Sequence, residues 1–187
     1  MRRFALLLAL AVPAVLSTAS AQTRANDEVR ASPNAVVGQT IGTTEITVGY
    51  SRPSVRGRAV FGPDTTSLVP YGQVWRLGAN EATTVRVTGD VRVEGQPLAA
   101  GTYALFAIPG PTEWTLVFNW TAEQWGAYEY DEAQDALRVT VTPEVSDAAE
   151  EPEEMFEIGF DDVTPTSTVM EIEWDRVSVP VRIEVAG

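Results

Sequence analysis

Two short stretches of the sequence concentrate side chains that can bind anions. They are YSRPSVRGRAVFG at residues 50–62 and VWRLGANEAT at residues 74–83. Their polar candidates are Arg52, Arg56, Arg58, Arg76, Asn80 and Glu81. The planar guanidinium of arginine binds carboxylate or phosphate through paired hydrogen bonds, and binding sites usually lie on loops of a rigid scaffold. These residues are therefore the candidate site for a small anionic ligand.

The same residues could instead stabilise the fold. Arg76 would then pair with Glu81 or Asp64, and Arg52 would cap carbonyl groups at the end of a strand. Buried pairs of arginine and carboxylate are one way to hold long loops against a folded domain. The sequence leaves the ligand site and the structural clamp open as alternatives.

Aromatic residues form a second candidate group. The segment NWTAEQWGAYEY, residues 119–130, holds two tryptophans and two tyrosines. Exposed aromatic rings can stack on sugar rings, so Trp125 and Tyr128 are candidates for contact with a glycan. The alternative is that these rings anchor the loop or belong to the core, and Trp114 and Trp174 are expected in the core.

Catalysis requires a different set of residues. A glycosidase needs two carboxyl groups on either side of the scissile bond, and Glu81 with Glu129 or Asp131 is the pair to test. The chain has no histidine and no cysteine, which removes a serine–histidine triad and a thiol nucleophile. The sequence also lacks a phosphate-binding glycine loop. We expect no metal and no cofactor, and Glu81 is the one candidate catalytic residue.

The charge balance restricts the partners. The chain has 26 acidic residues, 13 arginines and no lysine, for a net charge of −13. This charge argues against binding to nucleic acid or to an anionic membrane surface. An acidic composition without lysine is typical of proteins adapted to high salt, although a genome rich in arginine codons would give the same bias. Residues 111–187 hold 19 of the acidic residues, so an anion is expected to bind the first half of the chain.

The N-terminus has the layout of a signal peptide. Two arginines precede an apolar run at residues 4–16, and ASA at residues 19–21 suits cleavage. The run is too short to span a membrane. The sequence therefore predicts a signal peptide at 1–21, an N-terminal extension at 22–35 and one domain at 36–187. We expect an exported protein, periplasmic or extracellular, and its oligomeric state is not predictable.

Strand patterns dominate the mature chain. Short runs that alternate apolar and polar residues are separated by turn residues, which indicates an all-β protein. The expected strands are 44–50, 73–77, 84–88, 91–93, 102–108, 113–120, 136–141, 155–160, 169–174 and 177–185. The single helical candidate is 121–125, and Pro180 suggests that the last strand lies at an edge or contains a bulge. The pattern predicts a single antiparallel β-sandwich, jelly-roll-like, with about ten strands and little helix.

Several blocks occur in an order that is similar to a known family. They are YSRPSVRGRAVFG, LVPYGQVWRLGANEATT, LAAGTYALFAIPG, EWTLVFN and QWGAYEY. The chain resembles the exported bacterial domain-of-unknown-function family 2911 from about residue 32 to residue 185. The resemblance implies export but no catalytic or binding residue, because the family is uncharacterised.

Taken together, these patterns favour an exported module that binds a small anionic or glycan ligand, or a partner protein, through its arginine-containing loops. Two alternatives from other classes remain. One is a histidine-free polysaccharide hydrolase or lyase that uses Glu81. The other is a purely structural envelope protein.

Overall fold

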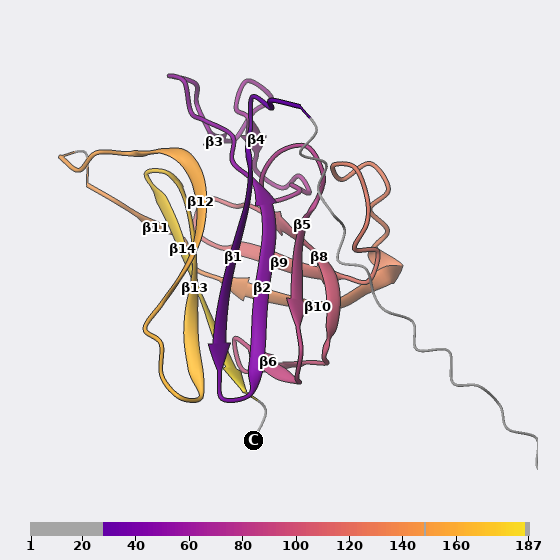
Figure 1. Cartoon of the computed structure of the whole chain (residues 1–187). Helices are drawn as coiled ribbons and strands as arrows, with labels where there is room; N and C mark the ends of the chain where they lie inside the picture. Colours follow the sequence, from indigo (N-terminus) through magenta and orange to yellow (C-terminus); the bar gives the residue numbers. More distant parts are fainter. Residues whose placement is uncertain (1–27, 148, 186–187) are drawn as a thin grey trace, which may run out of the picture.

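The protein is a β-sandwich of two antiparallel sheets (Figure 1). The computed structural model describes residues 28–147 and 149–185, and the expected signal peptide at 1–21 lies outside them. The first sheet has the order β1 (Asn34–Ile41), β2 (Thr44–Ser51), β5 (Thr83–Val87), β8 (Gly101–Ile108), β9 (Trp114–Asn119), β10 (Asp135–Val141). The second has the order β12 (Glu153–Asp161), β13 (Ser167–Asp175), β14 (Val177–Val185), β6 (Val91–Val93), β7 (Gln96–Leu98), and β11 (Glu144–Val145) also pairs with β14.

Two small elements complete the fold. The strands β3 (Phe61–Gly62) and β4 (Val69–Pro70) form a short parallel pair at one end of the sandwich, at the top of Figure 1. A single turn of 3-10 helix covers Glu132–Gln134. The expected all-β sandwich is confirmed, with fourteen strands in the described residues instead of about ten.

Period-2 alternation places the core between the sheets. In β2, the apolar side chains of Ile46, Val48 and Tyr50 are buried and face the second sheet, which contributes residues such as Ile172 and Trp174. Trp114 and Trp174 are both buried, as expected. The alternation in the sequence therefore sets which face of each strand enters the core.

The strand β8 is buried on both faces. Phe106 packs with Ala82 and Val117 in a small second cluster outside the main core, and Ala127 and Tyr130 pack against that cluster from the loop after β9. This loop covers the outer surface of the first sheet. The continuous apolar run at 102–108 has this cause, because a strand covered on both faces needs apolar residues at every position.

Segment 50–56 covers the free edge of β12. The Tyr50 hydroxyl accepts a hydrogen bond from the backbone N–H of Ile158 and donates one to its carbonyl oxygen. Further along, the Phe156 N–H donates to the Pro53 carbonyl, and the Val55 N–H donates to the Glu154 carbonyl. These bonds satisfy an edge that would otherwise expose unpaired backbone groups.

Three expectations about local structure were wrong. Residues 73–77 form no strand and make only an isolated bridge between Trp75 and Ala107, because the chain turns sharply at Leu77. Residues 121–125 form no helix. The strand β14 is not at an edge, and it pairs with β13 past Pro180 without a register shift, so it has no bulge there. Pro180 lies between the short stretches where β11 and β6 pair with β14, so its missing N–H costs no ladder bond on that side.

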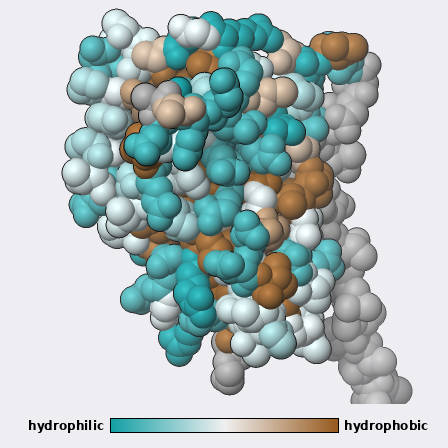
Figure 2. Space-filling model, turned by 90° about the vertical axis from the view of Figure 1, so that its left-hand side faces the viewer, coloured by the Kyte–Doolittle hydropathy of each residue, from teal (hydrophilic) through white to brown (hydrophobic). Residues whose placement is uncertain are grey.

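The outer face of the second sheet is acidic. Glu157 and Glu173 are directly opposite each other on β12 and β13, and Glu171 lies on the same face. Figure 2, which views the molecule from the side of these strands, shows a mostly hydrophilic surface there. Within the described residues, no helix is long and apolar enough to cross a membrane.

Candidate functional site

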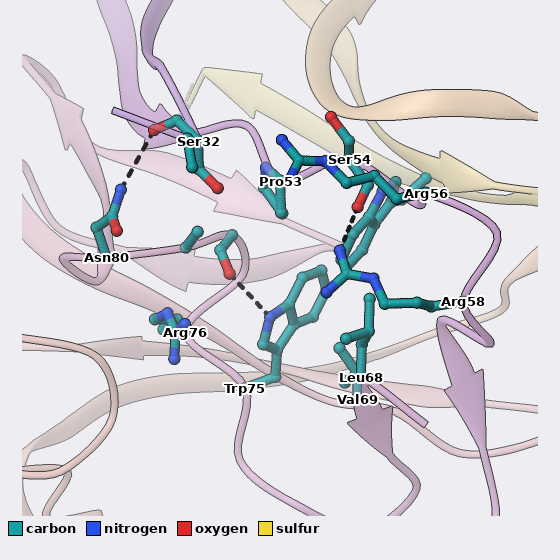
Figure 3. A pocket seen from close by; sticks show the side chains of 14 residues that line it. Ser32, Pro53, Ser54, Arg56, Arg58, Leu68, Val69, Trp75, Arg76 and Asn80 are labelled. Carbon is teal, nitrogen blue, oxygen red and sulfur yellow. Dashed lines mark hydrogen bonds between the residues drawn. The ribbon is translucent and has the colours of Figure 1, made fainter. Parts of the chain in front are cut away.

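A pocket of about 360 Å³ opens where the two arginine-containing segments meet (Figure 3). Its walls come from the N-terminal segment at 31–32, the loop at 53–58, residues 68–69, the turn at 75–80 and Trp174 of β13. Three arginines line it, Arg56, Arg58 and Arg76, together with Asn80. Of the described residues in its lining, none is aspartate or glutamate. The pocket is therefore electropositive in a strongly acidic protein.

The turn at 75–80 has an unusual backbone. Leu77 and Asn80 have positive φ angles of 51° and 60°, and Gly78 has a φ angle of 144°. A Cβ atom on Gly78 would lie 2.8 Å from the Ser51 carbonyl oxygen, so only glycine fits there. The Trp75 indole N–H donates to the Gly78 carbonyl and fixes the turn from inside. Backbone held in sparsely populated regions is found often at binding sites.

Arg76 is half-buried without a compensating charge. Among the described residues, no carboxylate forms an ion pair with it, and its buried Nε has no hydrogen-bond partner. Burial lowers the pKa of the Arg76 guanidinium below its ordinary value. A buried cation is normally paired, because its removal from water costs several kcal/mol. An anionic ligand would supply the missing partner.

The other two arginines differ in how far they are engaged. Arg58 donates from Nε to the Val55 carbonyl and from Nη2 to the Ser54 carbonyl, which leaves Nη1 for a ligand. Arg56 is exposed, and its backbone N–H donates to a carboxylate oxygen of Glu154. The side chain of Arg56 makes no hydrogen bond to a described residue, so its whole guanidinium is accessible at the rim.

Two candidates from the sequence lie outside this lining and act as clamps. Arg52 donates to the Phe156 carbonyl and pairs with Glu157 at 2.6 Å. Glu81 is buried and pairs with Arg30, whose Nη1 lies 2.8 Å from Oε2. The structural alternative therefore describes Arg52 and Glu81, although Glu81 pairs with Arg30 and, among the described residues, not with Arg76.

The aromatic candidates lie beside the pocket and outside its lining. Trp125 is 56 % exposed and Tyr128 is 82 % exposed, both in the loop after β9. The loop is attached to the turn at 75–80 by a bond from the Gly126 N–H to the Asn80 carbonyl. Asp131, one proposed partner of Glu81 in catalysis, caps the 3-10 turn by accepting from the Ala133 N–H.

Two tryptophans that were not among the candidate site residues also line the pocket. Trp174 lines the pocket, and its buried Nε1 has no hydrogen-bond partner in the described part of the chain. Trp75 stacks on Trp174, with the ring centroids 5.8 Å apart. Both indoles belong to the apolar part of the pocket lining. Both tryptophans alternate with polar neighbours in the sequence, which indicates that they are core residues. No sequence pattern distinguishes a core tryptophan with a paired indole N–H from one whose indole N–H is unpaired.

All the charged side chains in the lining are arginines, and the lining adds the hydroxyls of Ser32 and Ser54 and the Asn80 amide. The unpaired Nε of Arg76 belongs to a lining residue, although Arg76 Nη1 lies toward Gly126 in the loop after β9. Such a set matches an acceptor-rich group with negative charge, which means a carboxylate, phosphate or sulfate oxygen. Among residues 28–147 and 149–185, no group of three or more acidic side chains is placed to hold a metal ion.

The fold and the pocket define an all-β sandwich protein with an arginine-lined pocket at one end. The chain belongs to the family described as "Protein of unknown function (DUF2911)", whose model matches residues 32–183. No curated protein and no solved structure matches the chain. The expected family is thus confirmed.

Proposed function

We propose that this protein is an exported binding module that holds a small oxyanion in the pocket lined by Arg56, Arg58 and Arg76. The observation that carries the proposal is the half-buried guanidinium of Arg76, which has no partner charge among the described residues. The Arg76 guanidinium would bind the oxyanion, and Arg56 and Arg58 would add charge at the rim. The signal-like N-terminus supports export.

The enzymatic alternative has less support. Its proposed acid, Glu81, is bonded through both carboxylate oxygens to Arg30 and lies outside the lining of the pocket. The pocket that contains the arginines has no aspartate or glutamate in its described lining. A hydrolase would need a carboxyl group at the ligand, so the geometry favours binding over catalysis.

The test is a thermal-shift and calorimetric titration of the domain without its N-terminal 21 residues. The probes are galacturonate, glucose 6-phosphate, inorganic sulfate and a short peptide with a free carboxylate, all at equal ionic strength. We expect one class to stabilise the protein, by about 2.7 kcal/mol at 100 times its Kd. Arg76→Gln should remove this effect.

The matched control is Arg182→Gln, since Arg182 is exposed and paired with Glu184 on the outer face of β14. This variant should bind like the wild type. The proposal fails if no probe binds, or if the Arg76 variant binds as well as the control.

A further inference from the structure

A second cavity, of about 510 Å³, lies away from the arginine-lined pocket. It opens between the two sheets on the side where β7 ends one sheet and β10 ends the other. Its apolar wall comes from Val91, Leu98 and Ala136. Neither of the two arginine-containing segments, 50–62 and 74–83, contributes a residue to its lining.

A tryptophan forms an exposed platform in this cavity. Trp120 follows β9 and is 50 % exposed. The centroids of the Trp120 and Tyr103 rings are 4.6 Å apart. Tyr103 is fully buried, and its hydroxyl donates a hydrogen bond to the Ala99 carbonyl. The indole is thereby held in one place while part of its surface stays in water. A fixed, exposed aromatic ring presents the flat apolar surface on which a sugar ring can stack.

Polar groups of both kinds stand beside this platform. Asp90 uses Oδ1 to accept from the Ala100 N–H, and Oδ2 makes no hydrogen bond to a described residue. Arg92 uses Nη1 to donate to the Gly95 carbonyl and makes no ion pair with a described carboxylate. A free acceptor and free donors together suit a hydroxyl group, which both donates and accepts. An anion would be repelled by Asp90.

The other carboxylate of the cavity is fully engaged. Asp135 accepts from the Asn119 amide at Oδ1, and from the Tyr130 hydroxyl and Arg138 at Oδ2. Arg138 pairs with this carboxylate at 2.8 Å, and both of its oxygens already accept hydrogen bonds. The cavity therefore lacks the second available carboxyl group that glycoside hydrolysis requires. Its groups are sufficient for binding.

We propose that this cavity is a site for a neutral saccharide, which stacks on Trp120 and forms hydrogen bonds through its hydroxyls with Asp90 and Arg92. The site is separate from the oxyanion pocket in position, residues and ligand chemistry. Each site can therefore be tested without the other.

The experiment is a calorimetric titration of the domain with five neutral hexasaccharides, of the cello-, xylo-, manno-, malto- and chito- series. Each is titrated up to about 10 mM, which is enough to detect a Kd of about 1 mM, a binding free energy of about −4.1 kcal/mol. We expect at least one to bind. Trp120→Ala should weaken that binding by about tenfold or more, the size expected for loss of an aromatic contact. Asp90→Asn keeps the Oδ1 acceptor for the Ala100 N–H but removes the carboxylate oxygen Oδ2, and it should also weaken saccharide binding.

Val163→Ala is the matched control, because Val163 is as exposed as Trp120, at 50 %, and lies outside the lining of this cavity. It should bind the saccharide like the wild type. Trp120→Phe, which keeps a ring over Tyr103, should bind with intermediate affinity and shows that the fold is retained. The proposal is overturned if none of the five saccharides binds, or if Trp120→Ala binds as tightly as Val163→Ala.

Discussion

Arg30 Nη1 lies within 2.9 Å of both carboxylate oxygens of Glu81, although 51 residues separate the two in the sequence. Both side chains are largely buried, at 14 % and 10 % exposure. The pair fastens the segment before β1 onto the turn that contains Arg76. The Asn80 amide also donates a hydrogen bond to the Ser32 carbonyl, which attaches the same segment before β1 to the turn at 75–80.

Removal of one charge of this pair should destabilise the fold. Glu81→Gln leaves the Arg30 guanidinium buried and unpaired, and we expect a loss of about 3 kcal/mol in the free energy of unfolding, measured with urea. Glu184→Gln breaks the exposed pair with Arg182 and should cost less than about 1 kcal/mol. Equal losses in the two variants would show that the Arg30 pair is not a clamp.

The Tyr50 hydroxyl should contribute measurably to stability. Tyr50→Phe leaves the N–H and the carbonyl of Ile158 without partners at a buried edge, and we expect a cost of about 2 kcal/mol. Tyr71→Phe is the control, since the Tyr71 hydroxyl makes no hydrogen bond to a described residue. Urea unfolding of both variants gives the comparison; a Tyr50 variant as stable as the Tyr71 variant would contradict the role of this hydroxyl.

Gly78 should tolerate no larger residue. Gly78→Ala places a methyl group 2.8 Å from the Ser51 carbonyl oxygen, at a φ angle of 144°, and we expect a loss of more than about 3 kcal/mol. Gly95→Ala also has a positive φ angle, of 74°, but meets no atom within 4 Å. It should cost only about 1 kcal/mol. Thermal unfolding separates the effect of the clash from that of the backbone angle.

The acidic face should make stability depend on pH. Burial, followed by the charges of Glu171 and other nearby carboxylates, raises the pKa of Glu173. A carboxyl group whose pKa is raised by folding stabilises the protein at low pH, and this contribution is lost as pH rises through the folded pKa. Glu173→Gln should therefore be more stable than the wild type at pH 7.

The advantage of Glu173→Gln should fade as the pH falls to about 3.5, below the ordinary range of glutamate pKa values. Glu113→Gln, at an exposed position away from this face, controls for the loss of one negative charge. Urea unfolding at both pH values provides the measurement. An advantage of Glu173→Gln that persisted at low pH, or that Glu113→Gln shared, would contradict the assignment.

Much of the fold was predictable because the core is formed by regular alternation. Strands such as β2 and β5 alternate buried and exposed residues along their length, so their pattern is visible in the sequence. Residues 73–77 show the same alternation but turn at Leu77, whose positive φ angle no apolar pattern predicts. The strand β1 was missed because Gly38 and Gln39 interrupt its apolar positions.

The candidate site was predictable only in part, because charge pairing depends on distant residues. Arg52 and Arg76 look equivalent in the sequence. Glu157, which neutralises Arg52, lies 105 residues away, while Arg76 meets no carboxylate in the described chain. Only the structure separates the arginine of a clamp from the arginine of a pocket.

The cover over β12 also bears on self-association. Tyr50 and segment 53–55 use the backbone groups that this edge strand would otherwise offer to another chain. If the cover detached, β12 would become a template for strand pairing between molecules. Damage at this segment would then appear first as aggregation of otherwise folded molecules, so one arginine-containing stretch both borders the pocket and shields this edge from strand pairing.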